Sequence, residues 1–481
     1  MYKLASAKDA KGNAITVTPK DADGNELDPS LKGIVWTVTG EDEKLGPVNT
    51  CHFYYDVDAQ YVFDFSVTDK AGNTTSCHQE FFIDTKAPAG ANLILPKEVR
   101  KDTLDGSDYR FYDGQIEVGI NSSDVTSGIA SIRYECINQA DNTVFQSKEF
   151  TPETVYSGKG IARTDGVLSN ETVSVSFKIE KDFRGYVKIY VKDRTGNEYV
   201  KQENLVVVVD TVKPVIKVEY DNNDVKNGKY YSADRTALIS LTEANYFAED
   251  NGAEERILNI KVSKTDSTTG KKTEEYLTAP LAAVADNPGL YQCSYKFSDD
   301  AAYTLSITYA DRSGNQAPDY QSPEFVVDKT APKIHVSYDN NSARNSDQFN
   351  AIRKATIVIE ENNFDPAKVS VTVTSSGAAL AEYQAYLNNA ANWTHENNAF
   401  IAIITFDKEG HYTFGISCSD LAENGNVGVD CGDSVAPDKF TIDTTAPNNL
   451  TMTVGDTSVR GSMETVTFER FYQSAITVKL S

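Results

Sequence analysis

Four times along the chain, an alternating apolar strand runs into an Asp, a short turn and Gly-Asn, and a second apolar strand then ends in Asp followed by Pro. The terminal residues of the copies are Asp84, Asp210, Asp328 and Asp443, so that successive copies are 126, 118 and 115 residues apart. This period equals one β-sandwich domain and is longer than a solenoid repeat. The repeat therefore predicts an all-β chain of tandem β-sandwich domains in an extended array.

The strand before each turn alternates between apolar and polar residues. In the third copy the apolar positions are Tyr303, Leu305, Ile307 and Tyr309, and the first copy has the same pattern up to Val67. Strict alternation indicates that one face of the strand is packed and the other meets water. The turn has a local cause, because Asp accepts backbone hydrogen bonds and Gly adopts the left-handed conformation of a bulged hairpin.

The repeat also divides the chain into domains. Two copies are incomplete: the first lacks opening strands, and the last contains only opening strands. We expect a partial domain over 1–87, complete domains over 88–213, 214–331 and 332–446, and the start of a fifth over 447–481. No apolar leader begins the chain, so we expect an excised internal piece whose targeting signals lie outside it.

The charge balance excludes some classes of partner. The chain has 46 Lys and Arg against 70 Asp and Glu, for a formal net charge of −24. A field of that sign repels phosphate backbones, so nucleic acid is not an expected partner. No stretch of 18 apolar residues is present, so we expect no membrane insertion. The acidity suits solubility and also leaves carboxylates free to bind Ca²⁺.

The motifs resemble those of the bacterial immunoglobulin-like (Big) repeats of large surface adhesins. The resemblance rests on the Asp-x-x-Gly-Asn turn, on the linker Ile/Val-Asp followed by Pro, and on the segment from Ser122 to Ile129. It implies immunoglobulin-like sandwiches in an extracellular, bacterial cell-surface stalk or adhesin, often with Ca²⁺ between domains. Fold alone does not carry a ligand.

The recurring aspartates predict metal sites at the linkers. In such a sandwich the terminal Asp lies at the pole opposite the domain's own turn, so each terminal Asp should meet the turn of the next domain. Loops holding Asp124, Glu243 and Glu361 reach the same pole. Carboxylate and amide oxygens are ligands that Ca²⁺ prefers, although the same residues also suit plain turn and linker chemistry without a metal. The candidate ligands are Asp84, Asp193, Asn197, Asp210, Asp311, Asn315, Asp328, Asp420 and Asp443.

The cysteines are placed differently in each domain. Cys51 alternates with aromatic residues and Cys77 lies on the last strand of the first domain, which predicts a disulfide between the two sheets. Cys418 and Cys431 flank the fourth turn and are expected to form a second disulfide. The remaining two, Cys136 and Cys293, are expected to be buried thiols. Zinc is not expected at Cys51-His52 and Cys77-His78, because neighbouring strand residues point to opposite faces.

The sequence contains no catalytic motif, and acidic pairs such as Glu360-Glu361 suit a solvated loop. We therefore expect a non-catalytic, monomeric surface segment that projects or presents a binding site for a host glycan or protein, with no cofactor beyond structural Ca²⁺. Two alternatives stay open. One domain could bind host immunoglobulin, or the chain could be the accessory stalk of a secreted glycosidase or protease.

Overall fold

The computed structural model describes residues 2–9, 11–44, 46–151, 163–164, 167–168, 172–251, 257–426, 438–448, 451–454, 457–460 and 473–480. Within these ranges the regular structure is almost entirely strand, which confirms the predicted all-β fold. The described helices are short, and they comprise α2 (Ala381–Leu387), η1 (Ala248–Asp250), η2 (Pro366–Lys368) and η3 (Ala390–Asn392).

The chain forms two compact units. Unit 1 comprises Met1–Val215, Thr242–Asp250 and Thr308–Pro318, and unit 2 comprises Ile216–Leu241, Asn251–Ile307 and Asp319–Ser481. Unit 1 thus contains two loops, Thr242–Asp250 and Thr308–Pro318, that are continuous with strands of unit 2.

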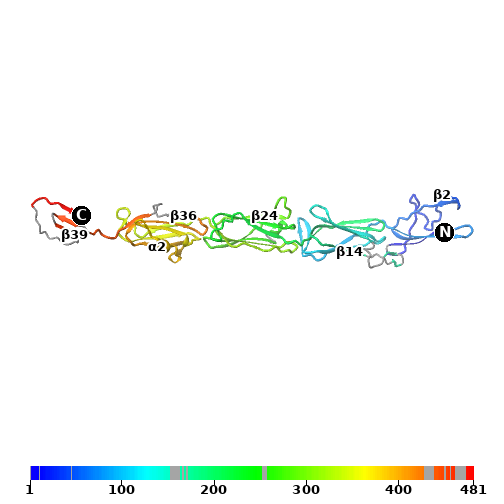
Figure 1. Cartoon of the computed structure of the whole chain (residues 1–481). Helices are drawn as coiled ribbons and strands as arrows, with labels where there is room; N and C mark the ends of the chain where they lie inside the picture. The colour runs from blue at the N-terminus through cyan, green and yellow to red at the C-terminus, as the bar shows by residue number, and fades with distance from the viewer. Residues whose placement is uncertain are drawn as a thin grey trace. The chain divides into compact units, whose positions relative to one another are not determined.

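A β-sandwich between residues 91 and 209 forms most of unit 1, and β14 marks it in Figure 1. One sheet has the order β11-β10-β15-β17-β8-β7 with β16 beside β15, and the other has the order β14-β9-β6. β17 pairs in parallel with β8. Its strands are β6 (Ala91–Ile94), β7 (Arg100–Leu104), β8 (Ser107–Tyr112), β9 (Ile116–Ser122), β10 (Ile129–Asn138), β11 (Val144–Phe150), β14 (Val173–Ile179), β15 (Phe183–Asp193), β16 (Glu198–Gln202) and β17 (Leu205–Val209), with a small hairpin of β12 (Arg163–Thr164) and β13 (Val167–Leu168).

A second sandwich lies between residues 215 and 327, where Figure 1 labels β24. Its sheets have the orders β18-β20-β24-β23 and β19-β27-β25-β21-β22, with β26 beside β25. The strands are β18 (Val215–Tyr220), β19 (Tyr230–Tyr231), β20 (Arg235–Thr242), β21 (Leu258–Asp266), β22 (Lys272–Tyr276), β23 (Ala282–Ala283), β24 (Leu290–Phe297), β25 (Ala301–Tyr309), β26 (Tyr320–Gln321) and β27 (Phe325–Val327). We call the sandwiches over 91–209 and 215–327 the second and third sandwiches, in chain order.

The fourth sandwich lies between residues 333 and 442 and repeats the strand orders of the third, with α2 added after β32. Its sheets have the orders β28-β30-β34-β33 and β29-β37-β35-β31-β32, with β36 beside β35. The strands are β28 (Lys333–Tyr338), β29 (Gln348–Phe349), β30 (Arg353–Glu360), β31 (Val369–Ser375), β32 (Ala378–Ala379), β33 (Thr394–Glu396), β34 (Ala399–Phe406), β35 (Gly410–Ser419), β36 (Gly425–Asn426) and β37 (Asp438–Ile442).

The two ends of the chain form smaller sheets. Near the start, β1, β4 and β5 form a three-stranded sheet and β2 and β3 form a hairpin. Near the end, β39, β38 and β40 form another three-stranded sheet. The strands are β1 (Tyr2–Lys8), β2 (Thr37–Asp42), β3 (Gly46–Thr50), β4 (Ala59–Thr68), β5 (Thr74–Ile83), β38 (Thr451–Val454), β39 (Thr457–Arg460) and β40 (Val478–Leu480). We call the strands over 2–83 the first region.

The packed faces follow the predicted alternation in the third and fourth sandwiches. On β25, the burial pattern alternates from Ala301 to Tyr309, and β35 alternates in the same way. The first region departs from the prediction, because Tyr61 is fully buried whereas Val67 is 51% exposed. Among the described strands, β4 pairs only with β1 and β5, and the fully covered part of this strand is confined to its first residues.

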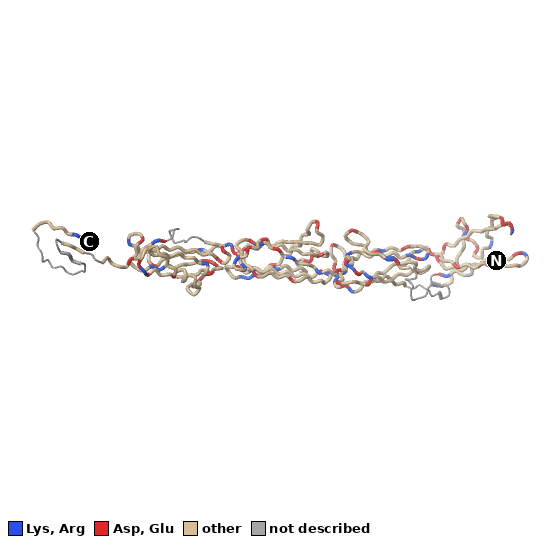
Figure 2. Tube along the Cα trace, in the orientation of Figure 1, with Lys and Arg blue, Asp and Glu red and all other residues tan. Residues whose placement is uncertain are grey.

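Charged residues are distributed along the strands and turns of the described chain. Lys and Arg are interspersed among the more numerous Asp and Glu (Figure 2). No helix in the described ranges is long and apolar enough to cross a membrane.

Candidate metal centres

Each turn after the long strand of a sandwich is built around one aspartate. In the second sandwich, Asp193 Oδ1 accepts hydrogen bonds from the backbone N–H groups of Thr195, Gly196 and Asn197 at 2.9, 2.7 and 2.8 Å. Gly196 has φ of 98°, a left-handed conformation that suits a residue without Cβ. The Asp-x-x-Gly-Asn sequence therefore specifies a five-residue turn that directs the Asp carboxylate inward.

The asparagine of each turn joins it to the preceding linker. Asn197 Nδ2 donates to the carbonyl oxygen of Asp84 at 3.0 Å, and Asn315 Nδ2 donates to that of Asp210 at 3.0 Å. The structure thus brings each of these terminal aspartates to the turn of the following sandwich. The amide hydrogens of Asn197 and Asn315 hold the two segments together in these contacts.

The fourth turn differs from the prediction in its register. Asn424, and not Asn426, closes the turn: its Nδ2 donates to the carbonyl oxygen of Asp328 at 2.8 Å and to Asp420 Oδ2 at 2.8 Å. Glu423 takes the position of the turn glycine and has φ of 69°. The turn is therefore no longer than the others, and the Gly425-Asn426 pair lies on β36.

Three triads of buried carboxylates result, and each combines a linker Asp, an acidic residue after the second core strand and the turn Asp. In every triad the carboxylate oxygens lie within 4.8 Å of one another. The first two triads lie within unit 1 and the third lies within unit 2. The members are Asp84, Asp124 and Asp193; Asp210, Glu243 and Asp311; and Asp328, Glu361 and Asp420.

The last candidate ligand does not join a triad among the described residues. Asp443 is exposed, and its Oδ1 accepts a hydrogen bond from the backbone N–H of Thr445 at 3.2 Å. Only opening strands are predicted after Asp443, so no partner turn is predicted for this residue.

Burial is the largest cause that raises the pKa values of Asp124, Glu243, Asp311, Asp328, Glu361 and Asp420. Burial, with the charges of Asp210, Asp311 and Asp250 adding to it, raises the pKa of Glu243 to about 8. In the third triad, burial raises the pKa of Glu361 to about 7 and that of Asp328 to about 6. Two unit charges at 4.8 Å repel by about 3 kcal/mol at an effective dielectric constant of 20. Three charged carboxylates in one buried triad therefore favour a bound proton or a bound cation.

The same turn elsewhere in the chain shows that turn chemistry does not raise the pKa. Asp69 and Asn73 form this turn in the first region, where Asp69 is exposed. There the side-chain hydrogen bond from Asn73 lowers the pKa of Asp69, and Asp9 and Asp21 behave in the same way. The upward shifts at Asp311 and Asp420 thus come from burial at the linkers, not from the turn itself.

The donor atoms of the triads fit a hard divalent cation. Every triad offers carboxylate oxygens and contains no His or Cys, a set that suits Ca²⁺ or Mg²⁺ better than Zn²⁺. None of the ion pairs in the described part of the chain involves a triad carboxylate. Two buried hydroxyls close to triad members in sequence, those of Ser127 and Ser313, have no hydrogen-bond partner among the described residues. These orphaned oxygens are further donors of the type that Ca²⁺ uses.

Sequence reasoning missed two asparagines at the linkers. Asn245 Nδ2 donates to Asp210 Oδ2 at 2.6 Å, and Asn363 Nδ2 donates to Asp328 Oδ2 at 2.7 Å. Both residues follow the acidic residue of the triad by two positions, in Glu243-Ala-Asn245 and Glu361-Asn-Asn363. This shared Glu-x-Asn spacing was a signal in the sequence that would have identified them.

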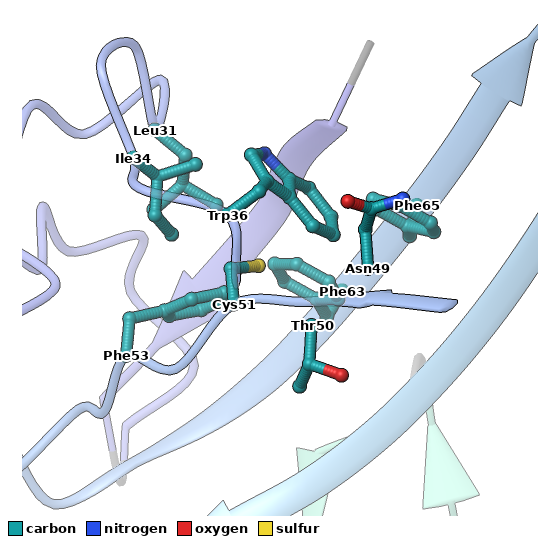
Figure 3. A pocket seen from close by; sticks show the side chains of 9 residues that line it. All are labelled: Leu31, Ile34, Trp36, Asn49, Thr50, Cys51, Phe53, Phe63 and Phe65. Atoms are coloured by element: carbon teal, nitrogen blue, oxygen red, sulfur yellow. The ribbon is translucent and has the colours of Figure 1, made fainter. Parts of the chain in front are cut away.

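An apolar pocket of about 250 Å³ lies in the first region (Figure 3). Trp36 and Phe65 face each other across it with ring centroids 6.4 Å apart, and Phe53 and Phe63 lie 5.8 Å apart. Cys51 contributes its thiol between these aromatic side chains. This pocket is separate from the carboxylate triads at the linkers, and we assign it no ligand.

The expected disulfide between Cys51 and Cys77 is wrong in this structure, where both residues are free thiols. Cys51 follows the separate β2–β3 hairpin and lines the aromatic pocket, whereas Cys77 is exposed on β5. Cys136 and Cys293 are also free, and burial raises the pKa of the Cys136 thiol to about 12. Cys418 is a buried free thiol, and its predicted partner Cys431 lies outside the described residues.

One part of the chain matches a known family. Residues 49–85 match the family profile described as a bacterial Ig-like domain. Such domains are typical of extracellular and cell-surface proteins, and the described sheets are immunoglobulin-like β-sandwiches. No curated protein matches the chain.

Several solved structures match the chain at low sequence identity. Dimeric latent PorU from Porphyromonas gingivalis is 11% identical with a TM-score of 0.20, over 74% of this chain and 34% of that chain. A marsupial T cell receptor is 11% identical with a TM-score of 0.21, over 69% of this chain and 97% of that chain. Murine CEACAM1b is 12% identical with a TM-score of 0.19, over 46% of this chain and 94% of that chain. The chain spans about a third of the length of PorU.

Proposed function

We propose that this chain is a non-catalytic segment of a bacterial cell-surface protein, in which Ca²⁺ bound at the linkers stiffens a stalk that presents a host-binding site. The observation that supports it is the recurrence of one buried carboxylate triad at each of three linkers. Every triad draws its members from a linker and from two loops of the following sandwich. A cation that binds all three groups therefore ties the linker to that sandwich.

Cation binding favours the state in which the linker contacts the loops of the following sandwich. A cation that binds only when linker and loops are together stabilises that arrangement, by about 2.7 kcal/mol when free Ca²⁺ is a hundredfold above its dissociation constant. It also removes the repulsion among the buried carboxylates, because two positive charges offset most of the three negative charges in a triad.

Isothermal titration calorimetry of the chelator-treated chain with CaCl₂ tests this proposal. We expect three bound ions per chain, and the loss of one ion in each of the variants Asp124→Asn, Glu243→Gln and Glu361→Gln. These residues are chosen because the amide replacement keeps an oxygen that accepts the local backbone hydrogen bonds. Asp69→Asn is the matched control, since it alters the same turn outside any triad. The absence of Ca²⁺ binding, or isotherms that are unchanged in the triad variants, would contradict the proposal.

The host-binding part of the proposal has a separate test. Fluorescently labelled chain is applied to immobilised mucin glycans, to serum proteins and to purified immunoglobulin. Saturable binding to glycans or non-immunoglobulin proteins agrees with an adhesin. Binding confined to immunoglobulin identifies the immune-evasion alternative, and no binding to any of them contradicts a presenting role for this segment.

A further inference from the structure

The second linker, residues 210–214 between the second and third sandwiches, has contacts in addition to its triad. The loops Thr242–Asp250 and Thr308–Pro318 extend from β20 and β25 of the third sandwich and belong to unit 1 together with the second sandwich. They carry Phe247, Asp250 and Arg312 against the outer face of β7, β8 and β17. We call the contacts of these three residues with that face the Phe247–Arg312 lock.

In the ionic part of the lock, Arg312 and Asp250 are buried and Asp102 is partly buried. The side chain of Arg312 is 3% exposed and lies between two carboxylates: Nε donates to Asp250 Oδ1 at 2.7 Å, and a terminal guanidinium nitrogen donates to Asp102 Oδ2 at 2.5 Å. Asp102 lies on β7 of the second sandwich, whereas Asp250 follows β20 of the third. The hydroxyl of Tyr309 donates to the other oxygen of Asp250 at 2.9 Å. Both carboxylates therefore have hydrogen-bonded partners.

The apolar part of the lock is aromatic. The ring of Phe247 makes edge contacts with Tyr109 and Phe111, with centroids 5.5 and 6.0 Å apart. Arg184 stacks over the same ring at 4.6 Å. Phe247 also packs into a buried cluster with Leu104, Val206 and Val208. Because Val207 and Val209 point into the sandwich core, β17 is buried on both faces.

Equivalent positions at the other two linkers lack this combination. The position of Phe247 is four residues after Glu243. The residue four positions after Glu361 at the third linker is Asp365, and the residue four positions after Asp124 at the first linker is Gly128. One residue after the turn aspartate, the third linker has Leu421 in place of Arg312, whereas the first linker has Arg194 but no aromatic residue that corresponds to Phe247. The ion pair described at the third linker, Lys226 with Glu423 at 3.6 Å, is partly exposed. Exposed pairs contribute little, whereas separating a buried, hydrogen-bonded pair is costly.

We infer that the Phe247–Arg312 lock holds the second linker closed without a metal, so that only the first and third linkers depend on a bound cation for stiffness. This contrast between the linkers rests on the proposed Ca²⁺ function, whereas the lock itself does not. The chain then has one permanent joint and two joints that respond to the concentration of divalent cations.

Hydrogen–deuterium exchange of the full chain in excess chelator tests the lock directly. The reporters are the linker amides at 210–214, where the N–H groups of Thr211 and Val212 donate to Asp182 Oδ1 and Asp210 Oδ1. The double variant Asp102→Asn, Phe247→Ala removes contacts with the second sandwich and leaves the Asp250–Arg312 pair intact. We expect these linker amides to exchange about a hundredfold faster than in the wild type, as expected from the loss of a buried ionic partner. Amides of the core strands β15 and β25 are expected not to change.

Glu423→Gln is the matched control, because it removes the exposed pair at the third linker and should not change exchange at 328–332. In the wild type, chelation should accelerate exchange at 84–88 and 328–332 but not at 210–214. Unchanged exchange at 210–214 in the double variant would overturn the lock. Exchange that accelerates equally at all three linkers on chelation would overturn it as well. If no linker responds to chelation but the double variant opens the second, the Ca²⁺ function fails and the lock stands.

Discussion

Replacing Glu361 by Gln in the third triad is predicted to stabilise the fourth sandwich in the absence of Ca²⁺ and to lose this advantage when Ca²⁺ is bound. Burial with Asp328 and Asp420 raises the pKa of Glu361 to about 7 from 4.5. A carboxyl group whose pKa is raised on folding costs stability as the pH rises through that range, and the full cost applies above the folded pKa. A rise of the pKa from 4.5 to about 7 corresponds to about 3 kcal/mol at pH 8.

In chelator at pH 8, the Glu361→Gln variant is therefore expected to be more stable than the wild type by up to about 3 kcal/mol, because Gln has no charge to bury. At a Ca²⁺ concentration a hundredfold above the dissociation constant, the wild type gains about 2.7 kcal/mol that the variant largely lacks. The advantage of the variant should then vanish or reverse.

Trp393 provides the assay, since it is buried in the fourth sandwich and its indole N–H donates to the carbonyl oxygen of Leu387. Urea unfolding is followed by its fluorescence in a Trp36→Phe background, which removes the other tryptophan. The control is Glu360→Gln, an exposed neighbour that should have no effect under either condition. A destabilised Glu361→Gln variant in chelator, or an equal Ca²⁺ response in variant and wild type, would refute the reasoning.

Further predictions follow from the same structure. Since burial raises the pKa of Glu243 to about 8, Ca²⁺ binding to its triad must displace a proton, and affinity measured by calorimetry should increase from pH 6 to pH 8; a flat profile would count against this. Glu423→Gly should stabilise the fourth sandwich by about 1 kcal/mol in urea unfolding, because Glu423 has φ of 69° and glycine adopts that conformation without strain. Alkylation of the unreduced native chain should modify the exposed Cys77 rapidly and the buried Cys136 only after unfolding, and mass spectrometry that finds Cys77 protected would contradict this assignment.

Much of the architecture could be predicted because its signals are local and repeated. The alternation from Tyr303 to Tyr309 specifies one buried face, and the Asp-x-x-Gly-Asn turn specifies its own hydrogen bonds. The spacing between terminal aspartates then indicates the size of a sandwich, and strand polarity indicates which turn each linker meets. The meeting of Asp84 with Asn197 follows from these three signals.

The parts that were missed depend on the three-dimensional neighbourhood of single residues. Glu423 occupies a left-handed position that normally selects glycine, so the pattern placed the turn two residues too far along, at Asn426. The exposure of Val67 depends on which strands cover β4. Asp102 lies 210 residues from Arg312 in the sequence, and Tyr109 lies more than 100 residues from Phe247, so no periodicity indicates these contacts.

The most direct test of the central claim is an anomalous difference map from crystals grown with Ca²⁺ or with Tb³⁺ in its place. The account predicts one peak within each of the three carboxylate triads, with carboxylate oxygens at about 2.3–2.6 Å from the ion. Triads that show no peak at a saturating ion concentration, with their carboxylates in the same positions, would contradict it.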